Sequence, residues 1–206
     1  MPGRSPERTT LLAASSHEQR QAGRLGSGQA LGPEYKLSCV ARAVNAAWRT
    51  EVTSILFVCL GNICRSPTAE MVLRARLPDM KNVASAGTSA VGGPIDARAA
   101  AALERAGIKP VKRFRSRQFE TADFERYDLI VAMDGNNLAD ILERRPEGAR
   151  ARVQRLLDFV PELQGRDVPD PYYGPAAGFD NALRLIEQGI DGMIAGMGDA
   201  PKRGGL

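Results

Sequence analysis

The sequence has 206 residues, 43% of them hydrophobic, which is enough for one domain with a buried core. The net charge is +4, from 28 Lys and Arg against 24 Asp and Glu. Residues 1–50 hold 7 of the basic and 3 of the acidic residues, which leaves 21 of each sign from residue 51 onward. Because the charges of that larger part cancel, its composition argues against a nucleic-acid-binding protein.

Residues 1–50 are rich in Gly, Ser, Ala and Arg and show little periodicity, so we expect an N-terminal extension without a packed core. The chain has three cysteines, Cys39, Cys59 and Cys64, without a regular disulfide framework, which favours a reducing compartment. The first thirty residues lack an unbroken apolar stretch, and no run of eighteen apolar residues occurs anywhere. We therefore predict a cytoplasmic protein without a secretory signal, a membrane-spanning helix or a membrane partner.

A strand, a loop and a helix are predicted between residues 54 and 76. The apolar, β-favouring run 55–58 ends at Cys59, and Ser66-Pro67 supplies the N-cap and first residue of a helix over 67–76. Backbone NH groups of the loop converge on the helix N-terminus, where the helix dipole also favours an anion. The loop is therefore predicted to bind phosphate through the residues Leu60, Gly61, Asn62, Ile63, Cys64, Arg65 and Ser66.

The spacing C-x5-R-S adds reactive groups to this loop. Cys59 is the candidate nucleophile, because the helix dipole and the Arg65 guanidinium would stabilise its thiolate. Arg65 can bind two phosphate oxygens at once, and Ser66 can donate its hydroxyl hydrogen to the thiolate. The alternative is that Cys59 is a core residue and Arg65 a solvated charge. The strand, loop and helix around the motif favour the phosphate loop.

The remaining elements alternate along the chain. Strands are predicted at 81–86, 128–133 and 153–159, and helices at 96–106, 119–127, 136–145 and 178–194. Such alternation is typical of βαβ units. We therefore predict an α/β fold: one three-layer domain over residues 51–197, with a central parallel sheet, helices on both faces and the phosphate loop after the first strand, and then a C-terminal tail at 198–206.

Asp170 is the candidate general acid. It lies between two prolines, which restrict the backbone and can hold the carboxyl group toward the loop. An Asp-Pro turn without a catalytic role is the alternative. Tyr172 and Tyr173 follow directly; they are predicted to form an aromatic wall against a substrate ring, or else to pack this segment onto the domain.

Four segments carry a resemblance to a known family: VCLGNICRSPTAE at 58–70, SAGT at 85–88, DLIVAMD at 128–134 and DPYYG at 170–174. Together they resemble the low-molecular-weight protein tyrosine phosphatases, in particular the bacterial type. The resemblance implies a phosphotyrosine hydrolase that also accepts small aryl phosphates and forms a cysteinyl phosphate. It implies the roles given above for Cys59, Arg65 and Asp170, a phosphotyrosine protein as partner, with a bacterial tyrosine kinase as one such protein, and no metal or other cofactor.

Further features follow from the same resemblance. It implies a reversible disulfide between Cys59 and Cys64, the alternative being that Cys64 is a small loop residue without a redox role. Asn62 is expected to support the loop from within. Relatives back this asparagine with a histidine from the segment equivalent to 114–118, which has no histidine here. The segment after SAGT, 88–94, is also short, so we expect a cleft that is open on that side.

Other functions fit less well. An arsenate reductase of this fold needs cysteines after Cys64, and the chain has none. Phosphoarginine phosphatases, by resemblance, carry Thr where this chain has Ile63. A phosphotyrosine-binding module without turnover would need neither a nucleophile nor an acid, and a Walker-type nucleotide loop would need Gly-Lys-Ser/Thr. A phosphatase thus remains the leading prediction.

Overall fold

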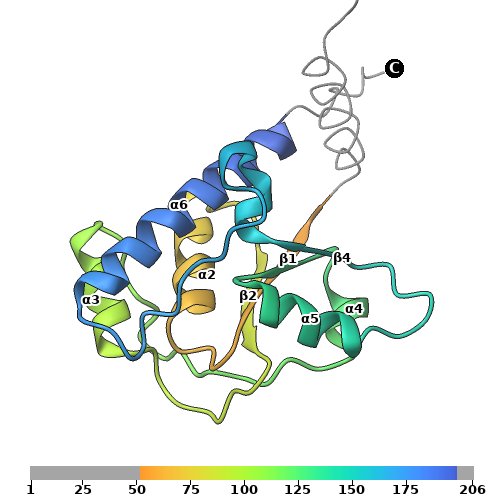
Figure 1. Cartoon of the computed structure of the whole chain (residues 1–206), viewed down its shortest axis with the longest axis horizontal. Coiled ribbons are helices and arrows are strands. Elements are labelled where there is room, and N and C mark those ends of the chain that lie inside the picture. Colours follow the sequence, from red (N-terminus) through yellow and green to blue (C-terminus); the bar gives the residue numbers. More distant parts are fainter. Residues whose placement is uncertain (1–51, 199–206) are drawn as a thin grey trace, which may run out of the picture. The chain divides into compact units, whose positions relative to one another are not determined.

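The computed structural model describes residues 52–198 (Figure 1), so the predicted extension and nearly all of the predicted tail lie outside it. The described strands are β1 (Ser54–Cys59), β2 (Asn82–Gly87), β3 (Leu129–Ala132) and β4 (Arg152–Arg155). The helices are α2 (Arg65–Arg76), α3 (Ala97–Arg105), α4 (Asp123–Arg126), α5 (Gly135–Glu143) and α6 (Ala177–Gly198), with short 3₁₀ turns η1 (Leu156–Phe159) and η2 (Pro161–Leu163). Within residues 52–198, no helix combines the length and apolar character needed to cross a membrane.

The four strands form one parallel sheet in the order β2-β1-β3-β4. β1 is an inner strand, and Leu56 pairs with Ala84 of β2 on one side and with Ile130 of β3 on the other. All six residues of β1 are buried, as an apolar run covered on both faces must be. Because the strands are parallel, their carboxyl ends share one edge of the sheet, and Cys59 is at that edge.

Helices cover both faces of the sheet (Figure 1). Successive residues of β1 point to opposite faces: Ile55 and Phe57 join a core with α2, α3 and α6, whereas Leu56 and Val58 join a core with Phe124 of α4 and Ile141 of α5. This alternation explains why β1 contains no polar residue between Ser54 and Cys59. The predicted three-layer α/β fold with a parallel sheet is confirmed.

The last strand is shorter than the predicted 153–159. β4 ends at Arg155, and Leu156 to Phe159 form the 3₁₀ turn η1. A strand would send Leu156 and Leu157 to opposite faces, but both are buried in the core that contains α6. The 3₁₀ turn lets consecutive leucines face the same helix, and Leu156 fits there because a Cβ at Gly189 would lie 2.5 Å from its Cγ.

The helix predicted over 119–127 is also shorter, since α4 spans only four residues. The residues before it are extended: Gln118 forms a bridge with Gly87, and the Phe119 amide donates to the Gly87 carbonyl at 2.8 Å. This pairing places Phe119 against Phe124 in an edge-to-face contact with ring centroids 5.5 Å apart. Tertiary pairing at the sheet edge therefore overrides the local helical pattern.

Candidate active site

A cleft of about 310 Å³ opens at the carboxyl edge of the sheet. Its lining comprises the predicted residues Cys59, Leu60, Gly61, Ile63, Cys64, Arg65, Asp170, Tyr172 and Tyr173, and in addition Ser89 and Val91. The structure thus brings nearly all the predicted site residues to one place, although Asp170 is more than one hundred positions from the loop. Two predicted residues, Asn62 and Ser66, do not line the cleft but are fully buried behind it.

Cys59 is the last residue of β1, and its thiol lies at the base of the loop. Its Sγ atom is 3.0 Å from the Ser66 hydroxyl oxygen and accepts a hydrogen bond from the Asn62 amide at 3.3 Å. The Ser66 hydroxyl and the Asn62 backbone amide can each donate a hydrogen bond to a thiolate. The amides of Gly61, Ile63 and Cys64 have no acceptor within residues 52–198, which leaves them available to an anion in the cleft.

The helix after the loop starts earlier than predicted. α2 begins at Arg65, with Cys64 as the N-cap residue, instead of at Pro67. The Ser66 side chain does not cap the helix. Its hydroxyl oxygen accepts from Asn62 Nδ2 at 2.9 Å, and its single hydrogen can be donated either to the Cys59 sulfur or to the Ala86 carbonyl, which is 3.1 Å away. The earlier start places Arg65 in the first turn of α2, so the helix backbone fixes the position of the Arg65 Cα and Cβ atoms.

Asn62 holds the loop together from inside. Its φ of 54° lies in the left-handed region, which asparagine tolerates better than most residues. Its Nδ2 atom donates to the hydroxyls of Ser66 and Ser85, both at 2.9 Å, and its Oδ1 atom accepts from the Arg117 amide at 2.9 Å. Segment 114–118, which contains no histidine, therefore supports Asn62 through its backbone.

Two side chains behind Asn62 were not predicted from the sequence. The Ser85 hydroxyl donates to Glu70 Oε2 at 2.7 Å, and Glu70 Oε1 accepts from Arg74 Nε at 3.0 Å. Because a carboxylate can only accept, Ser85 must donate to Glu70 and accept from Asn62, and this fixes the orientation of the Asn62 amide. The sequence feature that could have indicated this support is Ser85 in the segment SAGT, at the carboxyl end of β2.

Gly87, in the same segment, is required by close packing. A Cβ at this position would lie 2.5 Å from the Leu60 carbonyl oxygen and 2.9 Å from the Asn62 amide nitrogen. The next residues are tied to the same loop, since the Thr88 and Ser89 amides donate to the carbonyls of Cys59 and Leu60, each at 2.9 Å. The carboxyl end of β2 thus forms a wall against which the loop is shaped.

Arg65 is 3% exposed, and its guanidinium joins two carboxylates. Nη1 donates to Asp134 Oδ2 and, at 3.1 Å, to the Val168 carbonyl, while Nη2 donates to Asp170 Oδ2 at 2.8 Å. Burial by itself would lower the pKa of Arg65, but the negative charges of Cys59 and the two carboxylates outweigh it and raise the pKa. The guanidinium is therefore a permanent positive charge beneath the cleft.

Asp134 is the main site residue that the sequence did not reveal. Its Oδ1 atom accepts from the Asn137 amide at 2.7 Å and so caps α5, while Oδ2 holds Arg65. The segment DLIVAMD was visible, and its final Asp follows a buried strand that ends at the same sheet edge as Cys59. An acidic residue directly after such a strand was the signal available.

Asp170 and its neighbour Asp167 have different surroundings. Asp170 is 41% exposed and also accepts from the Tyr172 amide at 3.2 Å. Asp167 accepts from the Gly135 amide at 2.9 Å, at the start of α5, and does not line the cleft. Only Asp170 can therefore reach a group bound over the loop.

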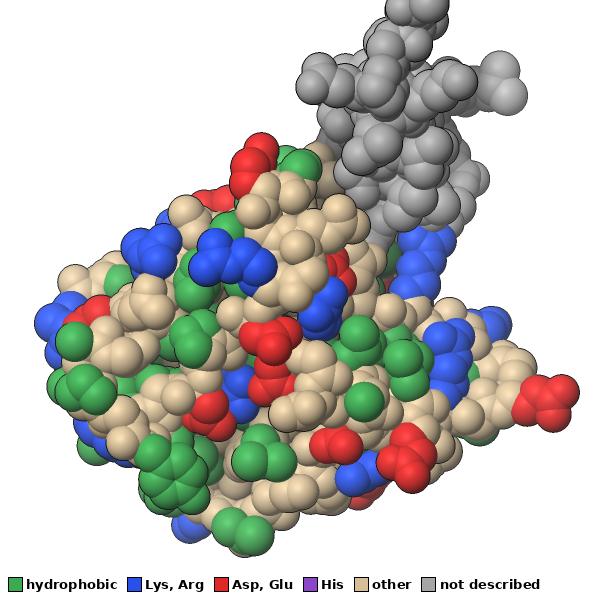
Figure 2. Space-filling model, viewed as in Figure 1, with side chains coloured by type: hydrophobic (Ala, Val, Ile, Leu, Met, Phe, Trp, Pro, Cys, Tyr) green, Lys and Arg blue, Asp and Glu red, His purple; other side chains and the backbone are tan. Residues whose placement is uncertain are grey.

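Aromatic and aliphatic side chains surround the mouth of the cleft. Tyr172 and Tyr173 are in edge-to-face contact at 5.0 Å, and Tyr173 is 97% exposed, so it does not pack this segment onto the domain. Tyr172 lies 5.5 Å from the Arg98 guanidinium, which pairs with Asp96. Figure 2 shows hydrophobic side chains spread over the lower part of the view, where Figure 1 places the loop between β1 and α2.

Cys64 is the second cysteine of the loop. Both are free thiols in this structure. Burial, together with the negative charges of Asp96, Cys59 and Asp170, raises the pKa of Cys64 to about 12. Cys64 is therefore a neutral thiol at physiological pH, and the predicted disulfide with Cys59 stays a prediction.

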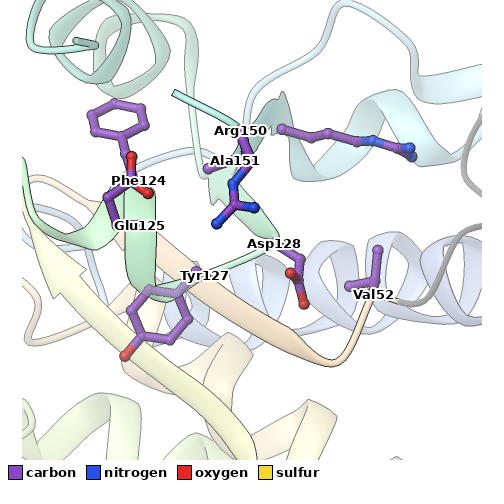
Figure 3. Close-up of a pocket in the computed structure, with 8 residues that line it drawn as sticks. Val52, Phe124, Glu125, Tyr127, Asp128, Arg150 and Ala151 are labelled. Carbon is purple, nitrogen blue, oxygen red and sulfur yellow. The ribbon is translucent and has the colours of Figure 1, made fainter. Parts of the chain in front are cut away.

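A second hollow, of about 290 Å³, lies at the opposite, amino edge of the sheet (Figure 3). Figure 3 shows Val52, Tyr127, Asp128 and Arg150 around it. Asp128 Oδ2 accepts from the amides and hydroxyls of Thr53 and Ser54 at 2.8–3.0 Å. These bonds join the starts of β1 and β3, so the carboxylate serves the fold.

Comparisons with known proteins agree with this geometry. The family model described as low molecular weight phosphotyrosine protein phosphatase matches residues 54–201. A low molecular weight protein-tyrosine-phosphatase of Streptomyces coelicolor is 38% identical over 151 residues, which cover 68% of this chain and 91% of the relative.

Two solved structures are similar at TM-scores of 0.64 and 0.62. The first is Wzb of Vibrio vulnificus in complex with benzylphosphonate, at 33% identity over 70% of this chain and 99% of that one. The second is the tyrosine phosphatase Wzb of Escherichia coli K30 in complex with sulphate, at 34% identity over 68% of this chain and 95% of that one. This chain therefore belongs to the low molecular weight phosphotyrosine protein phosphatase family and is a protein-tyrosine phosphatase.

Proposed function

We propose that this enzyme hydrolyses phosphotyrosine in proteins, and small aryl phosphates, through a cysteinyl phosphate on Cys59. The observation that carries the proposal is the convergence of a thiol, a buried guanidinium and a half-exposed carboxyl group on one cleft. The complexes of the two Wzb structures with benzylphosphonate and sulphate support it, because these ligands are an aryl-bearing phosphonate and a tetrahedral dianion.

In the first step, the phosphoryl group would lie over the loop, with its oxygens bound by the free amides of Gly61, Ile63 and Cys64 and by Arg65. The Cys59 thiolate attacks phosphorus, and a sulfur–phosphorus bond forms as the bond to the tyrosine oxygen breaks. Asp170, in its protonated form, donates its proton to the leaving oxygen. Tyrosine is released as a neutral phenol.

In the second step, Asp170, now a carboxylate, accepts a proton from water. The water oxygen attacks phosphorus, the sulfur–phosphorus bond breaks, and Cys59 is restored as a thiolate together with inorganic phosphate. Ser66 and the Asn62 amide would stabilise the departing thiolate through the contacts at 3.0 and 3.3 Å.

Arg65 has to change partners in this cycle. Its bond to Asp134 joins two largely buried groups, whereas its bond to Asp170 involves a carboxyl group that is 41% exposed. A doubly charged phosphate can displace the exposed partner more easily than the buried one. We infer that Asp134 keeps the guanidinium in place while Asp170 is released for proton transfer.

The walls of the cleft support an aryl ester as substrate. Leu60, Ile63, Tyr172 and Tyr173 present apolar surface beside the loop. A phosphotyrosine side chain can place its ring against this surface while its phosphate reaches the base. We extend the proposal to phosphotyrosine proteins in general, with a bacterial tyrosine kinase as one candidate substrate.

The test is phosphate release from phenyl phosphate by the wild type and by Cys59→Ser, with a chelator present throughout. We expect the substitution to lower kcat by about 10⁴-fold or more, because it removes the nucleophile. Cys64→Ser is the matched control, since it changes the other loop cysteine but keeps its backbone amide; it should retain at least about a tenth of the activity. Equal activity of the wild type and Cys59→Ser would contradict the proposal, and so would an inactive wild type that still binds phosphotyrosine.

A further inference from the structure

A run of positive charge lies outside the cleft and has no role in the chemistry above. We define the basic loop as residues 109–115, between α3 and the bridge at Gln118; its charged residues are Lys109, Lys112, Arg113 and Arg115. No Asp or Glu occurs between Glu104 and Glu120. The segment therefore contains no acidic residue that could neutralise these charges locally.

The four cations are exposed and unpaired. None of them forms an ion pair or a side-chain hydrogen bond with any residue in the range 52–198. Other arginines between residues 52 and 198 behave differently, since ion pairs are formed by Arg65, Arg74, Arg76, Arg98, Arg105, Arg117, Arg126 and Arg155. The basic loop thus presents charge to solvent that the fold does not use.

The backbone of this segment is held in place. The Phe114 amide donates to the Val111 carbonyl at 3.2 Å, and the Phe114 ring packs against the main core. Ser116 is buried, so the inward residues 114 and 116 alternate with the outward residues Arg113 and Arg115. Anchored in this way, the two guanidiniums point away from the core.

The basic loop leads directly into residues that contact one wall of the cleft. The residues that follow it are tied to the segment after β2: the Ser116 amide donates to the Gly93 carbonyl at 2.8 Å, and Gln118 Nε2 donates to the Thr88 carbonyl at 2.6 Å. Ser89 and Val91, within that segment, line the cleft. Figure 1 shows the two segments crossing the lower part of the view together.

We propose that the basic loop is a docking surface for an acidic stretch of the protein substrate, next to the phosphotyrosine. This rests on the proposed function, because the substrate reaches the loop only when its phosphotyrosine occupies the cleft. Two carboxylates near the cleft do not compete for the loop, since Asp96 is paired with Arg98 and Asp134 with Arg65. Opposite charges on two binding partners raise their association rate and select among substrates.

The test uses two phosphotyrosine peptides of equal length, one with Glu on both sides of the phosphotyrosine and one with Gln in the same places. At low salt the wild type should show a kcat/KM about tenfold higher for the Glu peptide, and the preference should fall in about 0.5 M salt. The double variant Arg113→Gln/Arg115→Gln should lower the preference to about twofold or less. Phenyl phosphate, which is too small to reach the loop, reports on the catalytic centre of the same variant.

The matched control is Lys81→Gln/Arg150→Gln, which removes the same charge at the amino edge of the sheet and should keep the full preference. An equal loss in the control would mean that net charge, and not the loop, selects the substrate, and would overturn the proposal. Equal rates for both peptides with the wild type would also overturn it, while turnover of phenyl phosphate would leave the proposed function standing. If the wild type shows no peptide preference but binds single-stranded DNA or anionic vesicles through Arg113 and Arg115, the loop serves another partner and the proposal is wrong.

Discussion

The two edges of the sheet both carry charged side chains, but they are built differently. At the amino edge, the hydrogen bonds that Asp128 accepts come from Thr53 and Ser54, at the start of β1. At the carboxyl edge, Arg65 is shared between Asp134, which is 16% exposed, and Asp170, which is 41% exposed. At the amino edge the charge is satisfied by the amides and hydroxyls of two adjacent residues, and at the carboxyl edge by two partners, one of which can be exchanged.

This difference separates a structural site from a reactive one. A charge held by adjacent residues in a strand contributes to stability and has little freedom to bind anything else. A buried guanidinium with one exposed partner can accept a phosphate in its place. Substitutions at the carboxyl edge should therefore change catalysis more than stability, and those at the amino edge should do the reverse.

Replacing the exposed partner should produce the largest effect on phosphotyrosine. Asp170→Asn removes the proposed acid but keeps the size of the side chain, and we expect kcat for a phosphotyrosine peptide to fall by about 10²- to 10⁴-fold. The loss should be smaller for p-nitrophenyl phosphate, whose leaving group needs less protonation. Asp167→Asn, three residues away, is the control and should leave both rates nearly intact. Equal losses in the two variants would contradict the assignment of Asp170, and not Asp167, as the general acid.

Arg65→Lys tests whether the carboxyl edge needs a planar cation. A lysine cannot bind two phosphate oxygens side by side, so we expect kcat/KM for phenyl phosphate to fall by about 10²- to 10³-fold. The comparison is Arg155→Lys, because Arg155 also pairs with a carboxylate and a carbonyl, those of Asp158 and Gly165. If Arg155→Lys proved as damaging to turnover as Arg65→Lys, the special role of Arg65 would be lost.

Gly87→Ala tests the wall that shapes the loop. The new Cβ would lie 2.5 Å from the Leu60 carbonyl oxygen, so the loop must move. We expect a destabilisation of about 1–3 kcal/mol and a fall in kcat of about tenfold. Gly196→Ala is the control, since nothing lies within 4 Å of its Cβ position in α6. Thermal unfolding and kinetics on both variants measure the two effects, and an unchanged rate in Gly87→Ala would refute the close-packing argument.

The smallest effect on catalysis is expected at the amino edge. Partial burial acts to raise the pKa of Asp128, but hydrogen bonds from Thr53 and Ser54 outweigh it and lower the pKa. The stabilisation is therefore present above the unfolded-state pKa of about 3.9 and is lost as pH falls through the lower folded-state value. Asp128→Asn should lower the free energy of unfolding, measured in urea at pH 7, by about 1 kcal/mol, a small value because solvent screens this exposed carboxylate. It should leave kcat within about twofold of the wild-type value.

Asp128→Asn also tests the direction in which this stabilisation changes with pH. The stability difference between the wild type and Asp128→Asn should shrink when unfolding is repeated near pH 3. A difference that grows toward low pH would contradict the assignment of Asp128 as a carboxylate held by its donors.

The local parts of the site were readable from the sequence because they are contiguous. Cys59 ends one strand, Arg65 begins the next helix and the loop lies between them, so hydrophobic periodicity and residue spacing locate them without knowledge of the fold. The order of the strands was not readable in this way. Since β3 lies beside β1, Asp134 reaches Arg65 from 69 positions away, and no local pattern predicts that pair.

The ends of the helices and strands were predicted less well than their presence and type. The strand expected over 153–159 stops at Arg155 because Leu156 and Leu157 both turn toward the core that contains α6. The start of α2 at Arg65 depends on Ser66, whose hydroxyl is engaged by Cys59, Asn62 and Ala86 instead of capping the helix. In both cases a tertiary contact, absent from any local window, decides the boundary.

A phosphoryl group carried by Cys59 can be trapped and located. Asp170→Ala with p-nitrophenyl phosphate should accumulate the intermediate, because the good leaving group departs without the acid whereas hydrolysis lacks its base. After rapid quenching, peptide mass spectrometry should find one phosphoryl group on Cys59. Turnover accompanied by a phosphoryl group on another residue, or by none under conditions that preserve a thiophosphate ester, would contradict the account.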